Sequence, residues 1–149
     1  MAYHEDEAER VVGERCAAVV VKAGAVLLIK RMKNGQEYYV LPGGHPRINE
    51  DPAVAAIRET QEETGVIVTD PRLILEFPDG YNQRHRCYIC LWVSGDKPEL
   101  QGEERMRAAP DNRYQPDWFP LADVPQLTIV PLLVKQWLLD NYVFPNRRN

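Results

Sequence analysis

Apolar residues in this chain come mainly in short, β-branched or aromatic runs, and such runs predict strands rather than helices. Ala23-Gly24 separates the first two runs with the spacing of a tight hairpin turn. An Asn-Gly pair, Asn34-Gly35, is a turn signal ahead of the third run. The runs that predict a β-sheet are residues 16–22, 25–31, 37–41, 67–77 and 84–93.

Two segments have the spacing of amphipathic helices. The first is marked at both ends: Asp51 suits the N-cap, Pro52 suits the first helical position, and Gly65 suits a left-handed stop. The second covers residues 130–142, and the residues expected on its buried stripe are Leu133, Val134, Trp137 and Leu138.

The remaining segments are polar. Residues 95–116 are predicted as a long loop, and loops of this length are usually functional or disordered. Residues 117–119 predict a short strand, followed by a turn over residues 120–125. Residues 1–13 are expected to form a mobile acidic lead-in. The order of elements predicts one domain over residues 1–149, an α/β sandwich with a mixed sheet between helices.

The first predicted helix concentrates negative charge. At about 100° per residue, Ala53, Ala56, Ile57, Thr60 and Thr64 fall on one face. Glu59, Glu62 and Glu63 gather on the opposite face, where Glu59 and Glu63 are one turn apart and project together. A carboxylate cluster of this kind suits a hard divalent cation such as Mg²⁺. The alternative is an ordinary solvated acidic surface.

Composition narrows the functional classes. The formal net charge of −4 argues against a general nucleic-acid or membrane-surface binder. No apolar run approaches the length of a membrane span, and the first ten residues are too acidic for a signal peptide, so we expect a cytoplasmic protein. Cys87 and Cys90 have metal-site spacing, but residues three apart on a strand face opposite sides. We therefore expect Cys87 and Cys90 to be buried structural thiols. Together with Cys16, the three cysteines form no disulfide framework.

The helix and the loop before it contain a recognisable signature. Its residues are Gly44, Glu50, Arg58-Glu59, Glu62-Glu63 and Gly65-Val66. They reproduce the spacing of the Nudix box, so from Gly44 to Val66 the chain resembles a Nudix hydrolase. Thr60 stands where the signature usually has an aliphatic residue. We expect the Thr60 hydroxyl to bond back to a carbonyl of the preceding turn.

The resemblance implies a Nudix α/β/α sandwich and a pyrophosphatase activity: hydrolysis of a nucleoside diphosphate-linked substrate, by water attacking phosphorus. A nucleoside triphosphate, oxidised or not, is the favoured substrate, and an ADP-sugar is a further candidate. The implied cofactor is Mg²⁺, with Mn²⁺ as a substitute, and the expected metal ligands are Gly43, Glu59, Glu62 and Glu63. The alternative function is a Nudix-like nucleotide-binding or regulatory module without turnover.

Further roles follow from the same resemblance. Glu62 either shares a metal or takes a proton from the attacking water. Glu63, one of the expected metal ligands, also counts among the catalytic candidates. Arg58 is expected to orient Glu62, or else to be a plain helix-surface ion pair. Glu103 and Glu104, in the long predicted loop, are the other candidates for the proton acceptor.

Substrate contacts are less sharply indicated. The candidates are Arg31, His45, Tyr81, Arg84 and Arg86. On a strand Arg84 and Arg86 share one face and His85 takes the other, so only one group can point into the site. The expected binding partner is a small nucleotide substrate, and we expect binding neither to a membrane nor to a nucleic acid. A homodimer is an open alternative to a monomer.

Overall fold

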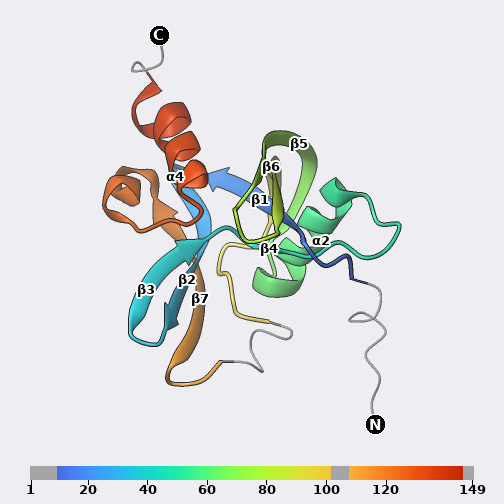
Figure 1. The fold of residues 1–149 in the computed structure, drawn as a ribbon. Helices are drawn as coiled ribbons and strands as arrows, with labels where there is room; N and C mark the ends of the chain where they lie inside the picture. The colour runs from blue at the N-terminus through green and yellow to red at the C-terminus, as the bar shows by residue number, and fades with distance from the viewer. Residues whose placement is uncertain (1–9, 102–107, 146–149) are drawn as a thin grey trace.

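The computed structural model describes residues 10–101 and 108–145, and a mixed β-sheet lies at its centre (Figure 1). The strands are β1 (Glu14–Lys22), β2 (Ala25–Lys33), β3 (Gln36–Val40), β4 (Gly43–Gly44), β5 (Ile67–Pro78), β6 (Arg84–Ser94) and β7 (Asn112–Pro120). Their order is β3-β2-β1-β6-β5, with β4 paired to β1 and β7 paired to β2. Strands β1 and β6 are parallel and the other pairs are antiparallel, which confirms the predicted mixed sheet.

The sheet opens between its two central strands. Strands β1 and β2 pair only beside their hairpin turn, at Val21↔Val26 and Lys22↔Ala25. Farther from the turn, β1 pairs with β4 instead, while β2 pairs with β3 and β7. The two halves of the sheet therefore diverge, and the short strand β4 lies beside β1 at Cys16 and Ala17, beyond the point where β1 and β2 separate.

Helix α2 (Pro52–Thr64) has the ends that the sequence predicts. The Asp51 side chain accepts a hydrogen bond from the Ala53 N–H at 2.8 Å, and Gly65 adopts a left-handed φ of 77°. The hydroxyl of Thr60 donates to the Ala56 carbonyl at 2.8 Å, as expected for a buried threonine inside a helix. The hydroxyl of Thr60, the unusual residue of the signature, therefore finds its hydrogen-bond partner within the helix.

The predicted division of α2 into an apolar face and a charged face is wrong in one respect. Glu59 and Glu63 are buried, with 8% and 4% of their surfaces exposed, and only Glu62 stays in solvent. At about 100° per residue, Glu63 lies only about 20° from Ala56, so it borders the apolar face rather than opposing it. Here β4 covers the edge that carries Glu59, because Gly44 lies against its carboxylate.

Two apolar clusters fill the two faces of the sheet, because alternate residues of β1 point to opposite sides. Ala17 and Val19 belong to the cluster beneath the C-terminal helix, and Ala18 belongs to the cluster beneath α2. Cys87 and Cys90 divide in the same way, so they cannot share a ligand. Both are buried free thiols, as predicted, and burial raises the pKa of Cys87 to about 11.

The long loop predicted over residues 95–116 ends too late. Strand β7 already begins at Asn112 and pairs with β2 along its whole length, from Lys33↔Asn112 to Ala25↔Pro120. The pairing uses backbone groups, and its partner is far away in sequence, so the local polarity of residues 112–116 does not reveal it. The predicted turn after β7 is the 3₁₀ helix η1 (Leu121–Gln126).

The predicted C-terminal helix is shorter and less regular than expected. Helix α4 (Leu132–Leu138) passes into a π-helical turn, η2 (Leu139–Val143). It starts after Pro131, because a proline disfavours helical conformation in the residue before it. Val134 and Leu138 are buried, but Leu133 is 43% exposed, which corrects the predicted stripe.

Helices α2 and α4 cover opposite faces of the sheet, the layered arrangement predicted from the sequence (Figure 1). Within the described ranges, no helix has the length and apolar character needed to cross a membrane.

Candidate active site

Two buried carboxylates on one edge of α2 lie beside the glycine pair of β4. Glu59 and Glu63 are one helical turn apart, so both side chains leave the helix on the same side. A Cβ atom added to Gly44 would lie 2.5 Å from Cδ of Glu59, and one added to Gly43 would lie 2.5 Å from the Cys16 carbonyl oxygen. Glycine is therefore needed at Gly43 for β4 to pass against β1, whereas a side chain at Gly44 would displace the Glu59 carboxylate.

Arg58 connects the acidic residues of the signature. Its Nε and Nη2 donate to the two carboxylate oxygens of Glu50 at 2.8 and 2.9 Å. Its Nη1 donates to Glu59 and to Glu62, each at 3.0 Å. These hydrogen bonds hold the pKa of Glu50 below its usual value and raise the pKa of Arg58. Arg58 thus stays charged and fixes two glutamates of the helix.

Glu62 differs from the other two glutamates. Its side chain is 48% exposed and its second oxygen lies 3.7 Å from Nη2 of Arg47. Within residues 10–101 and 108–145, no group of three His, Cys, Asp or Glu side chains is arranged to hold a metal ion. A metal role for Glu62 stays a prediction.

Glu59 and Glu63 still fit a magnesium ion. Mg²⁺ is usually bound by one or two carboxylates and keeps several water ligands, so it does not need a cage of three side chains. Two buried carboxylates on one helix edge supply the oxygen donors. The missing side chain of Gly44 leaves the Glu59 carboxylate in direct contact with the β4 backbone.

A small cavity of about 70 Å³ adjoins this edge of the helix, and we call it the inner cavity. Among the residues that line it are Glu63 and Gly43, together with two cations, Arg15 and Arg31. A larger outer cavity, of about 490 Å³, shares Arg15, Arg31 and Val40 with the inner one. The two cavities therefore meet at a pair of arginines, in the gap between the diverging strands.

Arg31 is held by the strands on its side of the gap. Its Nη2 donates to Oδ1 of Asn112 at 2.9 Å, and its guanidinium carbon lies 3.8 Å from the ring centroid of Tyr114. Its Nε is buried and makes no hydrogen bond to any described residue. The guanidinium thus retains a donor for a further acceptor.

Arg15 was missed by the sequence analysis. It donates to the Leu41 carbonyl at 2.9 Å and lines both cavities. The signal that could have found it is a cation just before the apolar residues of β1, at the position where the sheet opens.

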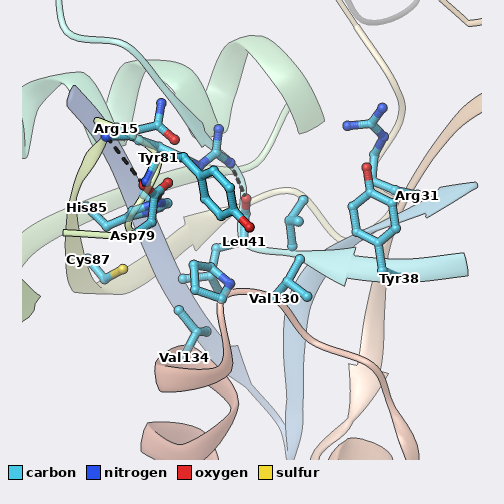
Figure 2. Close-up of a pocket in the computed structure, with 14 residues that line it drawn as sticks. Arg15, Arg31, Tyr38, Leu41, Asp79, Tyr81, His85, Cys87, Val130 and Val134 are labelled. Carbon is cyan, nitrogen blue, oxygen red and sulfur yellow. Dashed lines mark hydrogen bonds and ion pairs between the residues drawn. The ribbon is translucent and has the colours of Figure 1, made fainter. Parts of the chain in front are cut away.

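The far end of the outer cavity carries polar groups over an apolar floor (Figure 2). Leu41, Val134 and Cys87 contribute to the floor. Tyr81 extends over the cavity although 88% of its surface is exposed, and the imidazole of His85 pairs with Asp79. Tyr81 is one of the substrate-contact candidates named from the sequence; Asp79 was not singled out.

Other predicted contact residues lie elsewhere. Nδ1 of His45 lies 2.6 Å from the Glu14 carbonyl oxygen, and His45 lines neither cavity. Arg84 and Arg86 both pair with Glu76, on the strand face opposite to His85. Only His85 of that run reaches the outer cavity, in agreement with the alternation expected for a strand.

Two predicted residues lie outside the described part of the chain. They are Glu103 and Glu104, the loop candidates for the proton acceptor.

Comparison with known proteins identifies the family and agrees with the fold. A model of the NUDIX domain matches residues 13–138. A MutT NUDIX hydrolase from Burkholderia pseudomallei is 25% identical, with a TM-score of 0.59, over 85% of this chain and 96% of that one. A NUDIX-family hydrolase from Clostridium perfringens is 19% identical, with a TM-score of 0.65, over 87% and 97%.

A third structure comes from work on MutT of Aliivibrio salmonicida and Vibrio cholerae. It is 17% identical, with a TM-score of 0.64, and covers 85% of this chain and 94% of its own. At such identities the likeness supports the fold alone. The domain model, in contrast, spans most of the chain and includes the box on α2, and on that match the chain belongs to the Nudix family of hydrolases.

Proposed function

We propose that this protein hydrolyses a phosphoanhydride bond in a nucleoside diphosphate-linked substrate, with Mg²⁺ or Mn²⁺ as cofactor. A nucleoside triphosphate, oxidised or not, is the favoured substrate. The observation that carries the proposal is the position of Glu63: it is buried on the Nudix helix, yet it lines a cavity that two arginines also line. Carboxylates for a metal and cations for phosphates thus meet at one opening.

The burial of the two glutamates supports a metal-binding role. Two carboxylates buried one turn apart repel each other and lose solvation, and a bound cation would offset that cost. Arg58 offsets part of this cost at Glu59. Glu59, Glu63 and the backbone of Gly43 would hold the ion, which when bound supplies charge neutralisation at the phosphate and a more acidic water.

The remaining residues of the box act on protons and orientation. Glu62 is held at one oxygen by Arg58 and keeps a half-exposed side chain, so it can accept a proton from a water at the edge of the site. Glu103 and Glu104 remain alternative acceptors. Arg58 acts as a positioning residue, because its donors are directed to Glu50, Glu59 and Glu62.

The two arginines at the junction of the cavities suit the phosphate chain. A polyphosphate that extended from the outer cavity to Glu63 would lie near Arg15 and Arg31, which line both spaces. Charge-assisted hydrogen bonds to phosphate are stronger than neutral ones, and Arg31 has a buried donor without a partner among the described residues. The nucleoside then occupies the outer cavity.

A nucleotide panel tests the proposal. Purified protein with Mg²⁺ should release phosphate or pyrophosphate from at least one nucleoside triphosphate or nucleotide-sugar. Glu63→Gln should lower that activity by at least a hundredfold, because the amide removes a buried negative charge without changing the shape of the side chain. Glu99→Gln, at an exposed position outside both cavities, serves as the matched control and should keep full activity.

The opposite outcome has a clear meaning. If nucleotides bind to the protein but none is cleaved with Mg²⁺ or Mn²⁺, the protein is a regulatory or binding module of the Nudix type, and the hydrolase proposal is wrong.

A further inference from the structure

The turn between β5 and β6 is built around one carboxylate. Oδ1 of Asp79 accepts hydrogen bonds from the backbone N–H groups of Tyr81 and Gln83, at 2.7 and 3.3 Å. The Asp79 N–H donates to the Gln83 carbonyl at 2.9 Å, which closes the turn. Gly80 and Asn82 adopt positive φ angles of 84° and 64°. The backbone that carries Tyr81 is thus fixed on both sides.

The other oxygen of Asp79 anchors this turn to the sheet. It lies 3.0 Å from Nε2 of His85, whose ring is buried and stacks on Phe77, with centroids 5.0 Å apart and planes 4° apart. Asp79 therefore ties an exposed turn to a buried and well-packed imidazole. We call Asp79 and His85 the clasp.

Tyr81, the side chain that the clasp holds in place, buries little of its surface in the fold. Tyr81 is 88% exposed, and burial of apolar surface is what normally justifies an ordered aromatic ring. It nevertheless lines the outer cavity, facing the apolar floor around Leu41 and Val134 (Figure 2). A flat group that entered the cavity would lie between the Tyr81 ring and this floor.

We propose that Tyr81 is a stacking platform for the substrate's base, and that Asp79 and His85 are positioning residues that hold this platform over the outer cavity. The proposal rests on the proposed function for the identity of the ligand, a nucleotide whose phosphates point to Arg15 and Arg31. It adds which end of the site recognises the base and which residues make that recognition possible.

The test measures binding rather than turnover. Isothermal titration calorimetry would give dissociation constants of AMP, GMP, CMP and UMP, and of ribose 5-phosphate as a ligand that lacks a base. Tyr81→Ala should weaken the tightest monophosphate about tenfold, since stacking on an aromatic ring contributes substantially to base binding. Ribose 5-phosphate should bind unchanged. Tyr81→Phe keeps the ring and should bind like the wild type.

The clasp is tested by a double-mutant cycle. Asp79→Ala should weaken the same monophosphate several-fold in the wild type but not in the Tyr81→Ala background, because Asp79 acts through the tyrosine. Asp79→Asn keeps an acceptor for the Tyr81 N–H and should restore most of the affinity. Leu91→Ala, which changes an exposed apolar residue outside both cavities, is the control and should have no effect.

Three results would overturn the proposal. Tyr81→Ala could leave the affinities for the monophosphate and for ribose 5-phosphate unchanged, it could weaken both affinities equally, or no monophosphate could bind to the wild type. The proposed hydrolysis fails separately. If the wild type cleaves no nucleotide but monophosphate binding depends on Tyr81 as described, the stacking role of Tyr81 is supported and the hydrolase proposal is wrong. If nucleotides are cleaved but their binding does not depend on Tyr81, the hydrolase proposal is supported and the stacking role is wrong.

Discussion

The ion pair between Arg58 of helix α2 and Glu50 allows a quantitative prediction of how much a partly buried charge pair contributes to stability. Glu50 receives two hydrogen bonds from the guanidinium and a third from the Arg47 N–H at 2.9 Å. The side chains of Arg58 and Glu50 are only 18% and 13% exposed. Glu50→Gln removes the negative charge while keeping the size of the side chain, and leaves Arg58 with one amide oxygen in place of two carboxylate oxygens.

The expected loss of stability follows from that burial. Breaking one side of a fully buried pair costs about 3–5 kcal/mol, whereas an exposed pair contributes less than about 1 kcal/mol. This pair lies nearer the buried limit, and Arg58 keeps its contacts with Glu59 and Glu62. We expect a decrease of about 2–3 kcal/mol in the free energy of unfolding, which lowers the melting temperature by roughly 5–10 °C in a domain of this size.

Urea unfolding at pH 7, followed by the fluorescence of the three tryptophans, measures this difference. The difference should depend on pH with a defined sign. The pKa of Glu50 is lowered from 4.5 in the folded protein, so its contribution is complete above pH 4.5 and is lost as the pH falls through the folded-state value. Wild type and Glu50→Gln should therefore converge in acid. A loss below about 0.5 kcal/mol at pH 7, or a loss that persists unchanged in strong acid, would refute the argument.

Three further predictions concern other parts of the molecule. Gly44→Ala should lower activity at least tenfold with little loss of stability, because the new Cβ displaces the Glu59 carboxylate; activity and thermal unfolding of one preparation check this. Arg31→Ala should raise the KM for a nucleotide about tenfold with a smaller change in kcat, since a charged hydrogen bond to phosphate contributes about 1.5–3 kcal/mol; equal losses in both would contradict a binding role. Leu138→Ala should destabilise by about 2–4 kcal/mol and Leu133→Ala by less than about 0.5 kcal/mol in urea unfolding, because only the former is buried.

Elements with strong local signals were predictable from the sequence. Helix α2 carries its own N-cap, Pro52 and Gly65, so its limits are set by residues within the helix and beside it. The hairpin at Ala23-Gly24 and the strands of alternating or continuous apolar residues are local in the same sense. The family was also readable, because the Nudix box is a contiguous pattern on one loop and one helix.

Other features depended on partners distant in sequence. Strand β7 exists because β2 offers it a full ladder of backbone hydrogen bonds, and polar residues such as Asn112 do not signal that pairing. Leu133 faces solvent because the sheet reaches only the side of α4 that carries Val134 and Leu138. Local periodicity cannot tell which side of a short helix will be covered.

The candidate site shows the same division. The sequence by itself determined that Glu59 and Glu63 project together, since helical spacing alone dictates it. Only the tertiary structure decided that they are buried, because β4 closes over that edge of α2 at Gly44. Only the divergence of β1 from β2 brings Arg15 and Arg31 to the same two cavities, since these side chains belong to strands whose pairing stops short of them.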